Sequence, residues 1–143
     1  MPPKFEIRST KFETKKEMTE IQNPKQGNAK QYDLEDRTFK FAKAVRVFVK
    51  KLPKNIGNFE DAKQLVRSSG SIGANYIEAN ESLSKKDFIM RIKIARKEAK
   101  ESLFWLNLLD TNQDKNLETE CLNLIKECRE LMLILGSILR KSE

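Results

Sequence analysis

The 143-residue sequence has no histidine. This absence excludes the Ser-His-Asp and Cys-His nucleophile systems and every histidine-ligated zinc or iron site, and with them most hydrolase chemistry. Five glycines, four prolines and an aromatic share of 8% disfavour a turn-rich β-sandwich, whereas a hydrophobic share of 38% is enough for one core. The composition therefore favours a single helical domain without a cofactor.

The sequence also lacks a long apolar run. The longest, from Leu131 to Leu139, is interrupted by Gly136 and Ser137 and is far shorter than the roughly 20 residues that cross a bilayer. The N-terminus has no apolar stretch of the kind that a signal peptide needs. We therefore expect a cytoplasmic protein with no membrane partner.

Cysteine is scarce as well. Cys121 and Cys128 lie in one helical pattern, about 10 Å apart along its axis, which is too far for a disulfide between them. Both fall on the apolar stripe of that helix, where a free thiol usually behaves as a small buried hydrophobic group. We interpret them as core residues rather than as a redox or metal pair.

Four stretches have the apolar periodicity of amphipathic helices, over about 34–52, 59–82, 85–110 and 117–140. Three of them begin with a capping residue and an acid three positions later. These pairs are Asp33/Asp36, Asn58/Asp61 and Ser84/Asp87. Helices of this length with short connections predict an all-α fold, an up-down-up-down four-helix bundle.

Residues 1–32 differ from the rest of the chain. They are polar and contain Pro2, Pro3, Pro24 and Gly27, with too few apolar residues to form a core. We therefore expect a flexible, basic N-terminal arm over 1–32 and the folded bundle over 33–143.

The middle of the second predicted helix, residues 68–75, consists mainly of small residues with poor helix propensity. The apolar spacing continues in phase on both sides of this run, so we keep it helical. Its small side chains, among them Ser69 and Gly73, predict the close approach of a neighbouring helix.

The third predicted helix carries two apolar stripes on different faces. One of them includes Ile92, Ala99 and Leu106 and serves the bundle core. The second consists of Met90, Ile94, Trp105 and Leu108. Because a helix packed against a single core needs only one stripe, the second predicts contact with another subunit in a homo-oligomer.

The net charge of +7 is concentrated in the arm and in the first and third predicted helices. The candidate nucleic-acid-binding residues are Lys43, Arg46, Lys50, Lys86, Lys93, Arg96, Lys97 and Lys100. Clustered cations with few acids among them are typical of proteins that bind the phosphate backbone, although lysine-rich outer faces are also ordinary solvated surface. No base-reading motif is present, so binding to RNA or DNA should depend weakly on sequence.

Three segments, 64–79, 84–99 and 101–109, carry a family resemblance. The first contains the run Ser68-Ser69-Gly70-Ser71-Ile72-Gly73-Ala74-Asn75-Tyr76-Ile77-Glu78. Over about residues 33–140 the chain resembles the small four-helix bundle proteins encoded in intervening sequences of bacterial 23S ribosomal RNA genes. It is similar, more distantly, to the accessory variability determinant of diversity-generating retroelements.

The resemblance implies a left-handed bundle that assembles into a homopentamer and binds nucleic acid, with Trp105 as an interface anchor. The more distant relative adds a reverse transcriptase as a protein partner. For Asn75 and Glu78, which family members also carry, as for Ser69 and Gly73, we expect a structural role, since polar side chains in close-packed helices usually satisfy neighbouring polar groups.

Two alternatives to a nucleic-acid-binding bundle remain open. The basic surface would also suit a protein-interaction adaptor, such as a reverse-transcriptase accessory protein, that meets an acidic partner. An enzyme with a carboxylate-bridged metal would draw on Glu78, Glu81, Glu98 and Glu101, but such sites use a Glu-x-x-His motif and the chain has no histidine. We therefore expect no catalytic residues and no metal.

Overall fold

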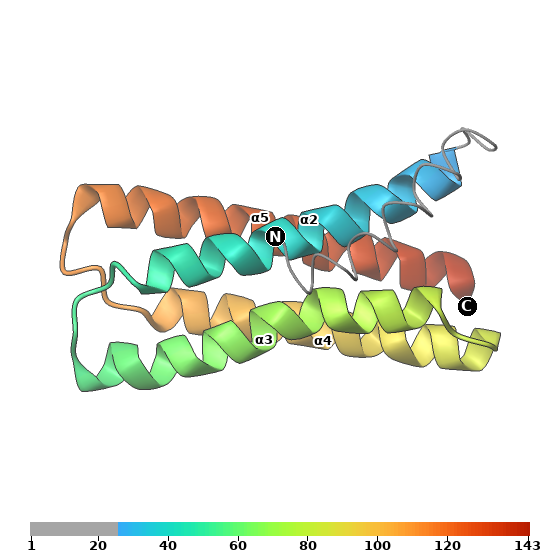
Figure 1. The fold of residues 1–143 in the computed structure, drawn as a ribbon, viewed down its shortest axis with the longest axis horizontal. Coiled ribbons are helices and arrows are strands. Elements are labelled where there is room, and N and C mark those ends of the chain that lie inside the picture. The colour runs from blue at the N-terminus through green and yellow to red at the C-terminus, as the bar shows by residue number, and fades with distance from the viewer. Residues whose placement is uncertain (1–25) are drawn as a thin grey trace, which may run out of the picture. The chain divides into compact units, whose positions relative to one another are not determined.

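The computed structural model describes residues 26–143, with side chains from residue 34 onward. Four helices follow one another: α2 (Gln26–Val49), α3 (Ile56–Asn80), α4 (Lys85–Leu108) and α5 (Lys115–Ser142). Each runs antiparallel to the one before it, and the described part of the chain contains no strand (Figure 1). The predicted all-α, up-down-up-down four-helix bundle is confirmed.

The chain divides into two units, Met1–Arg37 and Thr38–Glu143, and the boundary falls within α2. The packing described below concerns the second unit. The predicted arm lies mostly outside the described residues, because residues 1–25 are not described. Helix α2 begins at Gln26, well before the expected start near residue 34. Ala29, Lys30 and Gln31 are good helix formers and no proline lies between Pro24 and Pro53, so nothing in the sequence stops the helix there.

The start of α3 differs from the prediction. Asn55, not Asn58, is the N-cap, and its side chain accepts a hydrogen bond from the Asn58 N–H at 2.8 Å. The side chain of Asn58 is instead buried, 4% exposed. Its Nδ2 donates to the carbonyl oxygens of Pro53 (2.9 Å) and Asp110 (2.8 Å), and its Oδ1 accepts from the Asp110 N–H (2.9 Å). The side-chain amide of Asn58 thus links the α2–α3 turn to the α4–α5 loop at this end of the bundle.

The end of α3 and the start of α4 lie at the opposite end. Ser84 caps α4 as expected and accepts from the Asp87 N–H at 3.1 Å. Helix α3 ends at Asn80, close to the predicted end, and Leu83 is 98% exposed in the turn that follows.

The small residues of α3 allow close packing on two sides. A Cβ built on the buried Gly73 would lie 2.7 Å from Thr38 Oγ1 of α2, so only glycine fits there. Towards α4, the buried hydroxyls of Ser68 and Ser102 form a hydrogen bond of 2.7 Å. Ser69 is buried and donates to the carbonyl oxygen of Val66 at 3.2 Å. The serine and glycine run is therefore helical and close-packed, as the sequence predicts.

Both cysteines are free and buried, as expected of core residues. The Cys128 thiol donates to the Ala99 carbonyl oxygen at 3.1 Å and the Cys121 thiol to the Leu106 carbonyl oxygen at 3.5 Å, so both fix α5 against α4. Burial raises the pKa of Cys128 to about 12 and also raises the pKa of Cys121. Both thiols are therefore protonated and unreactive at neutral pH.

Candidate nucleic-acid interface

Helix α4 packs between α3 and α5 and leaves its remaining surface to solvent. The five buried residues of α4 form one stripe along the helix. They are Ile92, Ala95, Ala99, Ser102 and Leu106. The contacts with α5 and α3 lie on the two sides of this stripe, so the two other faces predicted from the sequence, one basic and one apolar, are both on the outside of the bundle.

The basic face of α4 is exposed along much of the helix. Its residues are Lys86, Lys93, Arg96, Lys97 and Lys100, all of them exposed. Lys93 Nζ lies 3.8 Å from Glu143 Oε2, an exposed and weak ion pair. The other four make no hydrogen bond or ion pair with a described residue, and Lys97 lies close enough to Glu101 to contribute to the lowered pKa of that carboxyl.

Helix α5 adds two arginines to this basic face, and the sequence alone did not reveal them. Arg129 and Arg140 are exposed, and neither has a hydrogen bond or ion pair with a described residue. With Gly136 they fall on one side of α5, and Gly136 faces Arg96 of α4. Helical spacing was an available signal, but the acids elsewhere in the fourth helix obscured it.

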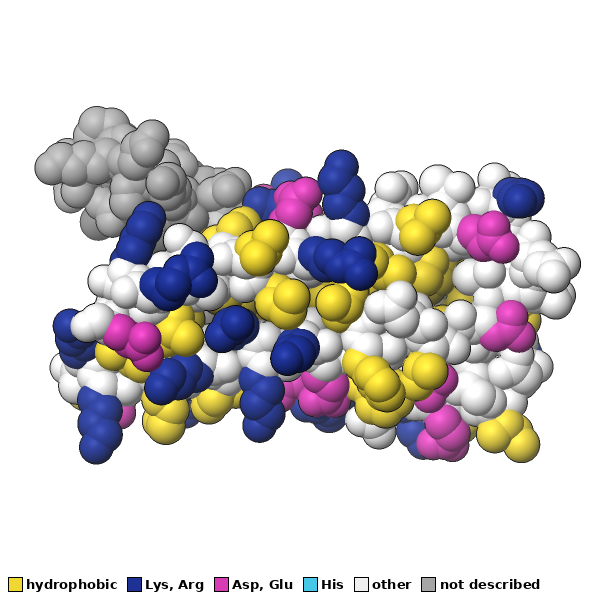
Figure 2. All heavy atoms as spheres, turned by 180° about the vertical axis from the view of Figure 1, so that it is seen from behind, with side chains coloured by type: hydrophobic (Ala, Val, Ile, Leu, Met, Phe, Trp, Pro, Cys, Tyr) yellow, Lys and Arg dark blue, Asp and Glu magenta, His cyan; other side chains and the backbone are white. Residues whose placement is uncertain are grey.

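We define the α4–α5 basic surface by seven residues: Lys86, Lys93, Arg96, Lys97, Lys100, Arg129 and Arg140. Figure 2 shows the face that α4 and α5 form, on which Lys and Arg side chains gather over the half nearer the α3–α4 turn. Apolar side chains lie among the cations and continue towards the other half of the face.

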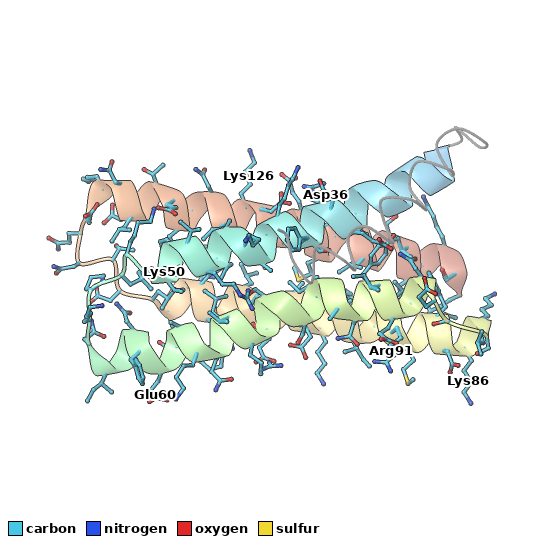
Figure 3. The ribbon with its side chains drawn as sticks, viewed as in Figure 1. Asp36, Lys50, Glu60, Lys86, Arg91 and Lys126 are labelled. Atoms are coloured by element: carbon cyan, nitrogen blue, oxygen red, sulfur yellow. The ribbon has the colours of Figure 1, made fainter. Side chains whose placement is uncertain are left out.

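The basic residues of α2 do not join this surface. Lys43 and Lys50 are exposed on α2, which contacts α3 through Thr38 beside Gly73, whereas α4 packs against α3 and α5. Lys50 lies near the α2–α3 turn and Lys86 near the α3–α4 turn, at opposite ends of the bundle (Figure 3). Arg46 is turned inward, because its guanidinium donates to the carbonyl oxygens of Ala42 (3.0 Å) and Val66 (3.4 Å). Arg46 and Lys50 are therefore not part of the basic surface on α4 and α5.

The apolar stripe predicted on α4 is only partly covered. Met90 is 48% and Leu108 50% exposed, while Ile94 and Trp105 are half-buried. The exposed ring of Phe104 meets Trp105 edge-on, with 4.9 Å between ring centroids. These side chains are therefore accessible to a further surface.

A polar network fixes the orientation of Trp105. Its indole N–H donates to Glu101 Oε2 at 3.1 Å, and Arg67 of α3 donates to the same oxygen at 2.6 Å and to Glu98 Oε1 at 3.1 Å. The hydrogen bond from Trp105, followed by that from Arg67, lowers the pKa of Glu101, and the two carboxylates raise the pKa of Arg67. Two of the four glutamates considered for a metal site are thus held by an arginine, and residues 34–143 contain no group of three metal-ligating side chains.

The remaining predicted structural residues have different environments. Asn75 is half-buried; its Nδ2 donates to the Ser71 carbonyl oxygen at 2.9 Å and its Oδ1 accepts from Arg91 of α4 at 3.0 Å. Glu78 lies on the outer face of α3, exposed, and its carboxylate makes no hydrogen bond or ion pair with a described residue. The structural role expected of Glu78 is therefore not seen.

The comparisons with known proteins agree with this architecture. The sequence profile of the 23S rRNA-intervening sequence protein family matches residues 30–137. The chain belongs to this family. A crystal structure of a protein of unknown function from the S23 ribosomal protein family of Bacteroides thetaiotaomicron is similar, with 32% identity and a TM-score of 0.65 over 78% of this chain and 98% of that chain. A comparison with curated proteins finds no match.

Membership of the family covers the bundle and leaves the N-terminal residues outside the match. None of the helices from α2 to α5 combines the length and the hydropathy that crossing a membrane requires. The family assignment identifies the family and the fold of the chain.

Proposed function

We propose that the protein is a non-enzymatic, homo-oligomeric bundle that binds RNA or DNA through the phosphate backbone, with weak sequence specificity. The α4–α5 basic surface carries this proposal. Six of its seven cations have no ion pair with a described residue, and the seventh, Lys93, has a weak one. Cations left without acidic partners attract polyanions and release their counterions on binding.

The exposure of these cations supports binding through charge rather than base recognition. The basic side chains stand on the outer sides of two antiparallel helices and lie at different heights along them. Such an arrangement contacts successive phosphates along a strand, and it presents no element that would enter a groove and read base edges.

Assembly is the second part of the proposal. Met90, Leu108 and the Phe104–Trp105 pair form an apolar region on the outside of α4, next to the basic residues. Aromatic and methionine side chains are enriched in interfaces between subunits, and Trp105 is already oriented by Glu101. A second copy docked on this face would bring two basic surfaces close together and multiply the charge that a nucleic acid meets.

Charge-reversal variants test the binding surface. We expect Lys97→Glu/Lys100→Glu to abolish retention of a structured RNA in a filter-binding assay at low salt. The control, Lys50→Glu/Lys54→Glu, makes the same change of charge near the α2–α3 turn and should retain binding. Equal losses in both variants would show that only the net charge matters and would contradict the proposed surface.

A protein partner is the alternative outcome. If the wild-type protein retained neither RNA nor DNA at low salt, but recovered one acidic protein after nuclease treatment through the same lysines, the adaptor hypothesis would replace this proposal. The exposed apolar side chains Leu122 (63%) and Leu133 (67%) on α5 would then belong to that contact.

A further inference from the structure

Gly136 occupies an unusual position in α5. It is buried in the interior of a helix, where glycine costs about 1 kcal/mol relative to alanine. Its backbone has no positive φ, so the conformation does not require glycine. What surrounds it is two arginine side chains. A Cβ built on Gly136 would lie 3.5 Å from Arg140 Nη1, 3.6 Å from Arg96 Nε and 4.0 Å from Arg96 Cδ.

The two arginines come from different helices and converge on this one point. Arg96 reaches it from α4, and Arg140 from the next turn of α5. At these distances an alanine methyl group would just fit, and a longer side chain would displace the guanidinium groups. Both arginine side chains therefore pack over the backbone of Gly136, which has no side chain of its own.

Neither arginine is neutralised. Both are exposed, and neither makes a hydrogen bond or ion pair with a described residue. The nearby acid of this end of the helix pair, Glu143, is placed beside Lys93 at 3.8 Å. Two like charges directed at one point repel each other, and an anion between them would convert this repulsion into attraction.

The chemistry of the pair suits a phosphate group. Each guanidinium presents planar N–H donors that match two oxygens of a phosphate, and the group remains charged at every physiological pH. The pair sits within the α4–α5 basic surface, where Lys97 and Lys100 on α4 and Arg129 on α5 continue the positive charge towards the α4–α5 loop. A phosphate held here would have neighbouring phosphates of the same strand within reach of those residues.

We propose that Arg96 and Arg140, lying over Gly136, form a two-arginine site that holds a single phosphodiester group of a bound nucleic acid. This inference rests on the proposed function and deepens it, because it assigns one defined phosphate contact to two residues of the α4–α5 basic surface. The other cations of the α4–α5 basic surface then add charge around that contact.

The first test measures affinity for a fluorescein-labelled RNA hairpin and a DNA duplex by anisotropy. Arg96→Ala/Arg140→Ala should weaken binding at least about tenfold, whereas Lys54→Ala/Lys115→Ala, which also removes two positive charges, should weaken it less than about threefold. Circular dichroism checks the fold of each variant; all four side chains are exposed, so we expect unchanged helicity. Equal losses in the two double variants would overturn the site.

The salt dependence tests whether the two arginines share one phosphate. If they do, the double variant should lower the magnitude of the log–log salt slope on the DNA duplex by about 1, and the two single variants should be strongly non-additive. A decrease of about 2 with additive losses of affinity would mean two separate phosphates and would overturn the shared site.

A charge-conserving pair of substitutions tests the geometry. Arg96→Lys/Arg140→Lys keeps the charge but removes the planar donors, so we expect weaker binding with an unchanged salt slope. Wild-type affinity in this variant would overturn the site, since charge alone would then suffice.

Further outcomes distinguish a free phosphate from a nucleic-acid phosphate, and a failure of the two-arginine site from a failure of the proposed function. Inorganic phosphate that raises the melting temperature of the wild type but not of Arg96→Ala/Arg140→Ala, with nucleic-acid affinity equal in both, would mean a free-phosphate site and overturn the nucleic-acid assignment. Wild-type protein that binds no nucleic acid at low salt contradicts the proposed function itself. Wild-type protein that binds normally, with no selective loss in the arginine variant, contradicts only the site.

Discussion

Replacing Gly73 with alanine should destabilise the bundle, even though the same substitution usually stabilises a helix. The new Cβ would lie 2.7 Å from Thr38 Oγ1 and 3.1 Å from Thr38 Cβ. Thr38 is 1% exposed, so its side chain has no free space into which to retreat. The two helices would have to separate locally or Thr38 would have to adopt a strained rotamer.

Two opposing contributions set the magnitude. Glycine to alanine within a helix normally gains about 1 kcal/mol of stability, and overpacking a dense core costs about 1–3 kcal/mol. A contact of 2.7 Å with a confined atom belongs at the upper end of the overpacking range. We therefore expect Gly73→Ala to lower the free energy of unfolding by about 1–2 kcal/mol, taking the difference of the two contributions.

Gly70 of the same helix provides the matched control. A Cβ there would lie 3.2 Å from Arg46 Nη2, the far end of a flexible side chain that can shift. Gly70→Ala should therefore be neutral or stabilise by up to about 1 kcal/mol. Urea unfolding followed by circular dichroism measures both variants, and adding Thr38→Ala to Gly73→Ala should restore about 1 kcal/mol through coupling of the two sites. A Gly73→Ala protein as stable as the Gly70→Ala protein would refute the close α2–α3 contact.

Three further predictions concern other parts of the bundle. Asn58→Ala should cost about 1–3 kcal/mol in urea unfolding, because it removes a buried side chain that bonds three backbone groups of Pro53 and Asp110, and a loss below about 0.5 kcal/mol would contradict this bridging role. The raised pKa of Cys128, about 12 because of burial, keeps the folded thiol protonated while the unfolded thiol ionises above about 9. The contribution of Cys128 to the free energy of unfolding should therefore be fully present below pH 9 and should fall by about 1.4 kcal/mol per pH unit above it. Cys128→Ala should lack this part of the pH dependence. Equal pH profiles for the two proteins would contradict the burial of this thiol. The emission of the single tryptophan, Trp105, should shift to longer wavelength when the oligomer is diluted to protomers. A sedimentation coefficient that remains that of a single chain at high protein concentration would exclude assembly through the α4 stripe.

The sequence was sufficient for the architecture because helical periodicity reports directly on burial. The apolar spacing placed Ile92, Ala99 and Leu106 in the core and left Met90 and Leu108 outside it, as the structure has them. The small residues of the second predicted helix were assigned correctly for the same reason, since their phase matched the apolar residues on both sides.

The parts that the sequence did not reveal depend on tertiary neighbours. Asn58 bonds to Asp110, 52 residues away, and its local pattern only indicated a cap. Arg46 has the spacing of an outer-face cation, but the glycine and serine surface of α3 leaves room for it to fold inward onto the Val66 carbonyl oxygen. The pairing of Arg96 with Arg140 requires knowledge of which side of α5 meets α4, and only the packed helices provide it.

The salt dependence of nucleic-acid affinity in the wild-type protein tests the central claim most directly. With the two arginines sharing one phosphate and the other five cations of the α4–α5 basic surface taking one each, about six phosphates are contacted, so log K for a DNA duplex should fall with log salt at a slope of about −5. Affinity that is absent at low salt, or a slope close to zero, would contradict the claim that this surface binds the phosphate backbone.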